Sequence, residues 1–117
     1  MTAEALPERN KSTAPPGFNS HRLCIIELGP EIPAMEGYGL RLSRVTVEPG
    51  AVFAPHSHAG QPEIIHVVEG LLAEQRNDGP WVDHGPGSVL VLTREITHAL
   101  ANRTDRPAVY MSTSVKR

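Results

Sequence analysis

The sequence predicts an all-β fold, either a sandwich or a barrel, and three observations support this prediction. Short segments with strand-like composition follow one another at short intervals between residues 22 and 114. Clusters of proline and glycine separate these segments, as expected for hairpins and corners. Eleven prolines and ten glycines also leave few uninterrupted windows in which a helix could form. The chain length of 117 residues fits one compact domain.

The predicted strands fall into seven segments, and the residues around His56 and His58 are interpreted as a further extended stretch. In chain order the seven cover residues 22–28, 39–47, 64–68, 71–75, 88–92, 98–102 and 108–114. The turns between them are predicted at Gly29-Pro30, Glu48-Pro49-Gly50, 77–80 and 85–87. Residues 1–20 mix charged and small polar side chains, so we expect a flexible N-terminal arm there and a barrel domain over residues 21–117.

The composition argues against several classes of function. Eleven Lys and Arg face thirteen Asp and Glu, which gives a net charge of −2 and no broad basic surface for nucleic acid or an anionic membrane. The one cysteine, Cys24, cannot form an internal disulfide, and its L-C-I-I context predicts a small buried apolar residue. The N-terminus lacks the apolar region of a secretory signal, and no apolar stretch is long enough to span a bilayer. We therefore expect a soluble, cytoplasmic protein.

The residues with the clearest chemical signal are His56, His58 and Glu63. In an extended strand, side chains two residues apart leave the backbone on the same face, so His56 and His58 can offer two ligands to one metal ion. The short link at 59–62 can return Glu63 on a neighbouring antiparallel strand toward the same ion. Parity with Glu63 places Ile65 and Val67 on its face and His66 on the other face, which argues against His66 as a ligand.

His98 is a fourth candidate ligand, from a hairpin some forty residues downstream. Imidazoles and a carboxylate suit iron, manganese, nickel, cobalt, copper or zinc, and four ligands leave positions open on an ion that prefers six. The alternatives are that His56 and His58 are a pair of surface histidines and that His98 is a hydrogen-bonded core residue. His21 and His84 are expected to be solvated and receive no role.

Two motifs in this chain resemble those of the cupin superfamily. The first motif, G-x5-HxH-x3,4-E-x6-G, is matched at every fixed position by Gly50, His56, His58, Glu63 and Gly70. The second, G-x5-PxG-x2-H-x3-N, is matched by Gly87, His98 and Asn102, whereas Thr93 and Glu95 replace the proline and glycine of the turn before the histidine. The resemblance implies a double-stranded β-helix, or jelly-roll barrel, with one metal ion bound by His56, His58, Glu63 and His98. It also implies a homodimer in which residues 22–28 pack across the interface.

The fold family does not determine the reaction, so the function must come from the pocket. Ile65, Val67 and Leu100 are predicted to face inward. Polar groups of the pocket could come from Tyr38, Arg41, Gln61, Glu74 or Gln75, and Trp81 could cover its rim, although for each of these residues a solvated surface position is the preferred interpretation. A partly apolar cavity with a divalent ion favours a small ligand that offers two oxygens. The leading hypothesis is a metal-dependent enzyme, a dioxygenase or an isomerase. The alternatives are a binding or sensing module that leaves its ligand unchanged and, more weakly supported, a purely structural ion.

Overall fold

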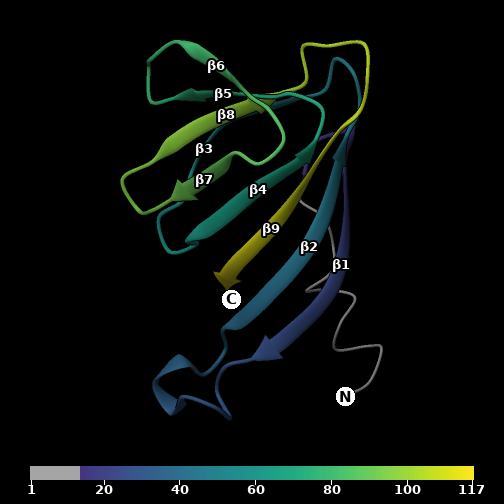
Figure 1. The fold of residues 1–117 in the computed structure, drawn as a ribbon. Helices are drawn as coiled ribbons and strands as arrows, with labels where there is room; N and C mark the ends of the chain where they lie inside the picture. Colours follow the sequence, from purple (N-terminus) through teal and green to yellow (C-terminus); the bar gives the residue numbers. More distant parts are fainter. Residues whose placement is uncertain (1–13) are drawn as a thin grey trace.

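The computed structural model describes residues 14–117, which form two antiparallel β-sheets packed face to face (Figure 1). The larger sheet has the order β1-β2-β9-β4-β7, and its strands are Phe18–Glu27, Gly39–Val47, Ala108–Lys116, Glu63–Glu69 and Val89–Leu92. The smaller sheet has the order β3-β8-β5-β6, and its strands are Val52–Ser57, Thr97–Ala101, Leu72–Arg76 and Trp81–His84. Among residues 14–117 the one helical segment is the single 3-10 turn η1, Pro33–Met35. The prediction of an all-β jelly-roll barrel is confirmed.

The seven predicted strands are all present, with ends that differ by a few residues. Residues 52–57 form β3, which agrees with the extended stretch expected around His56, while β6 was not predicted. The predicted arm extends too far into the domain, because β1 begins at Phe18 and this side chain is 3% exposed within the hydrophobic core. The rest of the predicted arm, residues 1–13, lies outside the described residues.

Strand alternation places the core between the two sheets, as parity predicted. On β4, Ile65 and Val67 are fully buried, whereas Ile64, His66 and Val68 are exposed on the outer face. Ile65 and Val67 pack with apolar residues of both sheets, which include Leu72, Leu90, Leu92 and Leu100. His66 therefore points away from the interior, as predicted.

Cys24 differs from its prediction, because it is exposed rather than buried. The register between β1 and β2 shifts between Arg22 and Cys24, which is the signature of a β-bulge in β1. A strand at the edge of the larger sheet with such an irregularity does not keep a single alternation, so the apolar context of Cys24 did not predict its side.

The motif glycines occupy turns that other residues adopt only with strain. Gly50, Gly70 and Gly87 all have positive φ values, of 81°, 75° and 92°. Gly70 has a second constraint, because a Cβ atom there would lie 2.5 Å from the carbonyl oxygen of Pro107 and 2.8 Å from the Cα of Ala108. The connection from β4 to β5 thus depends on glycine at this position.

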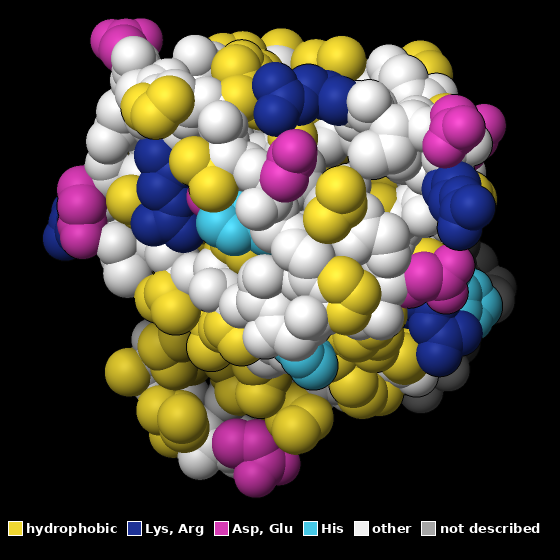
Figure 2. Space-filling model, turned by 45° about the horizontal axis from the view of Figure 1, so that its top comes forward, with side chains coloured by type: hydrophobic (Ala, Val, Ile, Leu, Met, Phe, Trp, Pro, Cys, Tyr) yellow, Lys and Arg dark blue, Asp and Glu magenta, His cyan; other side chains and the backbone are white. Residues whose placement is uncertain are grey.

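The hairpin of β1 and β2 extends beyond the barrel to the η1 turn at the lower end of the molecule (Figure 1). Hydrophobic side chains gather at this lower end (Figure 2). Leu23, Ile26 and Ile32 are exposed members of this hairpin and its connection. No helix within the described part of the chain is long and apolar enough to cross a membrane.

Candidate metal centre

Three histidines come together inside the barrel, at one end of the smaller sheet. His56 on β3 is directly opposite His98 on the neighbouring strand β8, and His58 follows the last residue of β3. The backbone N–H of His58 donates to the carbonyl of Ile96, 3.1 Å away, so the chain still lies beside the start of β8. One ring nitrogen from each histidine lies within 4.8 Å of the other two. Pairing of β3 with β8 thus brings His98 to the H-x-H pair despite the separation in sequence.

Each of the three rings is anchored through its Nδ1 atom to an acceptor. The Nδ1–H of His56 donates to the Ala54 carbonyl at 2.8 Å, and that of His58 to the Gln61 carbonyl at 3.0 Å. The Nδ1–H of His98 donates to the carboxylate of Glu74 at 2.7 Å. A carbonyl and a carboxylate can only accept, so the proton of each neutral ring must sit on Nδ1 and the lone pair on Nε2.

This tautomer arrangement suits a cation. The Nε2 atoms of His58 and His98 are 2.9 Å apart, and two lone pairs at this distance repel one another unless a proton or a metal ion lies between them. A neutral imidazole nitrogen is a common metal ligand, and its orientation through the other nitrogen is the usual arrangement around such ions. The donor set of His56, His58 and His98 therefore fits a transition-metal ion.

Glu63 reaches the same region from the opposite sheet. One carboxylate oxygen lies 3.7 Å from Nε2 of His58, and the other accepts a hydrogen bond from the hydroxyl of Ser112. The expectation that Glu63 returns on a strand next to β3 is wrong, because the link at 59–62 crosses between the sheets and β4 pairs with β7 and β9. The nitrogens of the three histidines form the close group, and Glu63 faces it across the barrel.

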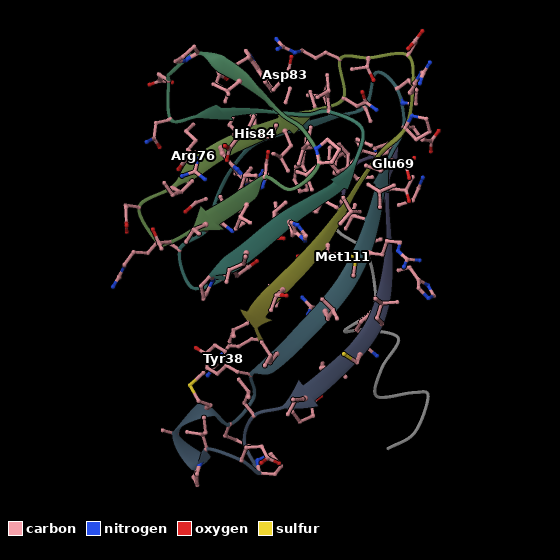
Figure 3. The ribbon with its side chains drawn as sticks, viewed as in Figure 1. Tyr38, Glu69, Arg76, Asp83, His84 and Met111 are labelled. Carbon is pink, nitrogen blue, oxygen red and sulfur yellow. The ribbon has the colours of Figure 1, made fainter. Side chains whose placement is uncertain are left out.

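Glu74 on β5 is a functional candidate that the sequence argument placed on the surface, and this expectation is wrong. Its side chain is only 3% exposed, and besides His98 it contacts the Nε atom of Arg76 at 3.0 Å and Nε2 of His84 at 3.3 Å. Arg76 and His84 lie on the adjacent strands β5 and β6, near one another in Figure 3. His84 is consequently half-buried and not simply solvated.

The charge state of Glu74 follows from these contacts. Burial opposes its ionisation, but hydrogen bonds from His98 and Arg76 outweigh burial and hold the pKa of Glu74 below its ordinary value. Strand alternation could have identified Glu74 as an inward-facing residue, because it shares a face with Leu72 in a segment with the composition of a buried strand. A carboxylate at an inward position needs partners, and His98 is one of them.

A cavity of about 490 Å³ opens beside His56 and His58. Its walls include Leu100, which was predicted to face inward, and Arg41 and Gln61, which were possible pocket residues although surface positions were preferred for them. Tyr38 lies at the far end of β2 in Figure 3, where the guanidinium of Arg117 sits 4.8 Å from its ring centroid. The polar residues that line the cavity from the larger sheet were missed: Ser20, His21, Arg22, Ser43, Ser112, Ser114 and Lys116.

On the wall formed by the larger sheet, Tyr110 and Lys116 have displaced pKa values. Burial lowers the pKa of Lys116, and the nearby charge of Arg41 lowers it further, while Glu63 opposes both effects. Burial strongly raises the pKa of Tyr110, and the charge of Glu63 adds to this, so the Tyr110 phenol stays protonated. Lys116 therefore releases its proton more readily than an ordinary lysine does.

The residues of the second motif have separable roles. The carbonyl of Thr93 accepts from the N–H of Ile96 at 3.0 Å, so a turn forms before His98 without the proline and glycine of the motif. Asn102 is buried, and its amide donates to the carbonyls of Val47 and Arg106 at 3.0 and 2.6 Å. Asn102 thus ties together the loops beyond β2 and β8, while His98 is the member of the motif that faces the site.

Comparison with known proteins agrees with this geometry. Residues 43–114 match the family model of the cupin domain. The chain belongs to the cupin family. The match covers β3 to β8, parts of β2 and β9, and all four of the predicted ligand residues, so the resemblance noted from the two motifs is confirmed.

Among curated relatives, this cupin is 28% identical to an auxin-binding protein of Prunus persica over 83 residues, which are 68% of this chain and 40% of that protein. It is 40% identical to a germin-like protein of Ipomoea nil over 65 residues, 52% of this chain and 30% of that protein. The chain thus spans less than half the length of the curated relatives it matches.

Solved structures resemble the whole barrel. KdgF from Halomonas sp. superposes with a TM-score of 0.67 at 20% identity, covering 94% of this chain and 91% of that chain. A cupin-superfamily sugar phosphate isomerase from Silicibacter pomeroyi superposes with a TM-score of 0.62 at 27% identity, covering 86% of this chain and 60% of that chain.

Proposed function

We propose that this cupin binds one divalent transition-metal ion through His56, His58, Glu63 and His98, and that it is a metal-dependent enzyme for a small ligand with two oxygen donors. The observation that carries the proposal is the set of three Nδ1 anchors, which leaves three Nε2 lone pairs directed at one place. Iron, manganese, nickel and zinc all suit this nitrogen and oxygen donor set.

The residues around such an ion have different proposed roles. A bound divalent ion supplies Lewis acidity, which polarises a ligand oxygen. The carboxylate of Glu63, positioned by Ser112, reduces the positive charge of the site. Lys116, with its lowered pKa, can give or take a proton on the ligand side of the cavity, and Leu100 and Phe53 limit the access of water.

The class of reaction is proposed from the same cavity. An isomerase needs a proton donor or acceptor that reaches the ligand, and Lys116 lines the same cavity as His56 and His58 and has a lowered pKa. The similarity to a solved sugar phosphate isomerase supports this class, whereas a dioxygenase is the second possibility that the metal ligands allow. The name of the auxin-binding relative supports the alternative, a module that binds a small molecule without converting it.

Metal analysis tests the first part of the proposal. Protein purified without added metal should contain close to one equivalent of a transition metal, and His98→Ala should lose it. His66→Ala is the matched control, because His66 is an exposed histidine on the outer face of β4. Retention of full metal content by His98→Ala and His56→Ala would exclude the proposed centre.

Turnover tests the second part. The metal-loaded protein should interconvert hydroxy-carbonyl compounds or consume oxygen with catechols, diketones or 2-oxo acids, and chelation should stop the reaction. Recovery of an unmodified ligand from the purified protein, with no turnover in either screen, would favour the binding module.

We also propose a homodimer, supported by the exposed apolar side chains of Leu23, Ile26 and Ile32 beside the edge strand β1. Light scattering should give twice the monomer mass, and Ile26→Glu should halve it. Val89→Glu, which alters a valine that is also exposed and lies on the opposite edge strand β7, should leave the dimer intact. A monomeric wild-type protein would contradict the proposal. Cytoplasmic residence stays a prediction.

A further inference from the structure

We propose that the ligand of this cavity carries an acidic group, a carboxylate or a phosphate, which Arg22, Arg41 and Lys116 bind on the wall opposite the three histidines. The inference deepens the proposed function, because it names the class of ligand for the same cavity. It rests on the larger sheet and not on the histidines, so it can be tested in protein without metal.

The register of the larger sheet places polar residues in rows across its inner face. In one row, Arg22 on β1 is opposite Ser43 on β2, and Ser43 is opposite Ser112 on β9. In the next row, Arg41 on β2 is opposite Ser114 on β9, and Ser114 is opposite Glu63 on β4. All six side chains line the cavity.

The inner face of the larger sheet changes abruptly from apolar to polar residues along the strands. Nearer the core, the inward-facing positions on the same strands are Val45 and Val47 on β2 and Tyr110 on β9, and all three are buried. A barrel that needed only stability would continue this apolar pattern, because burial of apolar surface is its main source of folding free energy. Serines and arginines at the inward positions instead provide hydrogen-bond donors to whatever fills the cavity.

Arg22 gives the most direct indication of an anion. Its Nη1 atom is shielded from solvent and has no hydrogen-bond partner among the described residues, although its side chain lines the cavity. A shielded guanidinium nitrogen without an acceptor is unfavourable, and a ligand oxygen would satisfy it. The guanidinium group presents paired donors that match the geometry of a carboxylate or phosphate.

The balance of charge on this wall also favours an anion. Among the described residues, Arg22, Arg41 and Lys116 contribute three cationic groups to the cavity, whereas Glu63 contributes the one carboxylate. Walls of low dielectric concentrate this field in the cavity. The volume of about 490 Å³ is within the range of small-molecule sites, so a ligand can place its acidic group against the arginines and another oxygen near the histidines.

The experiment compares two pairs of probes by calorimetry on the chelator-treated, metal-free protein. 2-Oxopentanoate and 2-pentanone differ by one carboxylate, and glycerol 3-phosphate and glycerol differ by one phosphate. We expect the member with the additional acidic group to bind about tenfold more tightly or better in at least one pair, which also identifies the acidic group. Equal affinities within both pairs would overturn the inference.

Variants locate the effect. Arg22→Gln and Arg41→Gln should each reduce the preference to threefold or less, whereas Arg44→Gln, which removes the same charge from the exposed face of β2, should leave it unchanged. Circular dichroism confirms that the variants are folded. A preference that survives in both cavity variants, or that falls equally in Arg44→Gln, would also overturn the inference.

The outcomes separate this inference from the proposed function. Selective anion binding by a protein that never takes up metal would sustain the acidic ligand and refute the metal centre. Stoichiometric metal binding without any preference in either probe pair would support the metal centre and refute the acidic ligand.

Discussion

The hydrogen bond between Glu74 and His98 predicts how strongly residues behind the site affect metal binding. Glu74→Gln replaces the one charged acceptor among the three Nδ1 anchors and keeps the shape of the side chain. Both partners are buried, so little solvent screens the loss of charge. Changes to residues that orient a histidine ligand cost about 10–100-fold in metal affinity. Because glutamine still accepts from Nδ1–H, we expect about tenfold, or about 1.4 kcal/mol.

Competition with a chromophoric chelator measures this affinity directly. Glu74→Ala removes the acceptor altogether and should approach the upper end of the range, about 100-fold. Glu69→Gln is the control, because Glu69 is an exposed glutamate on β4. Melting in chelator separates an effect on the metal from a general loss of stability. An affinity within twofold of wild type for both Glu74 variants would refute the reasoning that His98 depends on this carboxylate.

Three further predictions concern stability. Gly70→Ala should unfold at a clearly lower temperature than Gly87→Ala in a thermal melt, because both have positive φ but only Gly70 would clash with the carbonyl of Pro107; similar melting temperatures would argue against the clash. Asn102→Ala should cost about 1–3 kcal/mol in urea unfolding, because it leaves two backbone carbonyls without their donor, and a change below about 0.5 kcal/mol would contradict this role. Burial, with smaller effects from the charges of His98 and His58, lowers the pKa of His56, although its hydrogen bond to the Ala54 carbonyl opposes them. Between that lowered pKa and about pH 6.5, the unfolded chain therefore binds more protons than the folded protein does. The melting temperature of chelator-treated protein should fall as the pH is lowered through this window. His56→Gln should flatten this dependence of melting temperature on pH.

Much of the fold could be predicted from local pattern. Proline and glycine clusters marked the ends of most strands, and strict alternation on β4 separated buried Ile65 and Val67 from exposed His66. Alternation failed at Cys24, where a bulge in an edge strand changes the side that the residue faces. The β6 strand was missed because its four residues, W-V-D-H, carry too little pattern to be distinguished from a loop.

The sequence by itself determined the strands, the turns and the candidate ligands His56, His58 and Glu63, because each of these depends on spacing within a few neighbouring residues. Only the tertiary structure decided that β3 pairs with β8, which brings His98 to the H-x-H pair, and that Glu63 approaches from the opposite sheet. It also decided that Glu74 is buried beside His98 and that Arg22 lines the cavity, since a charged residue in a strand has the same local signature whether it faces solvent or a cavity. Which of the two it faces depends on strand pairing across the whole chain, and that pairing is set by the packing of the two sheets.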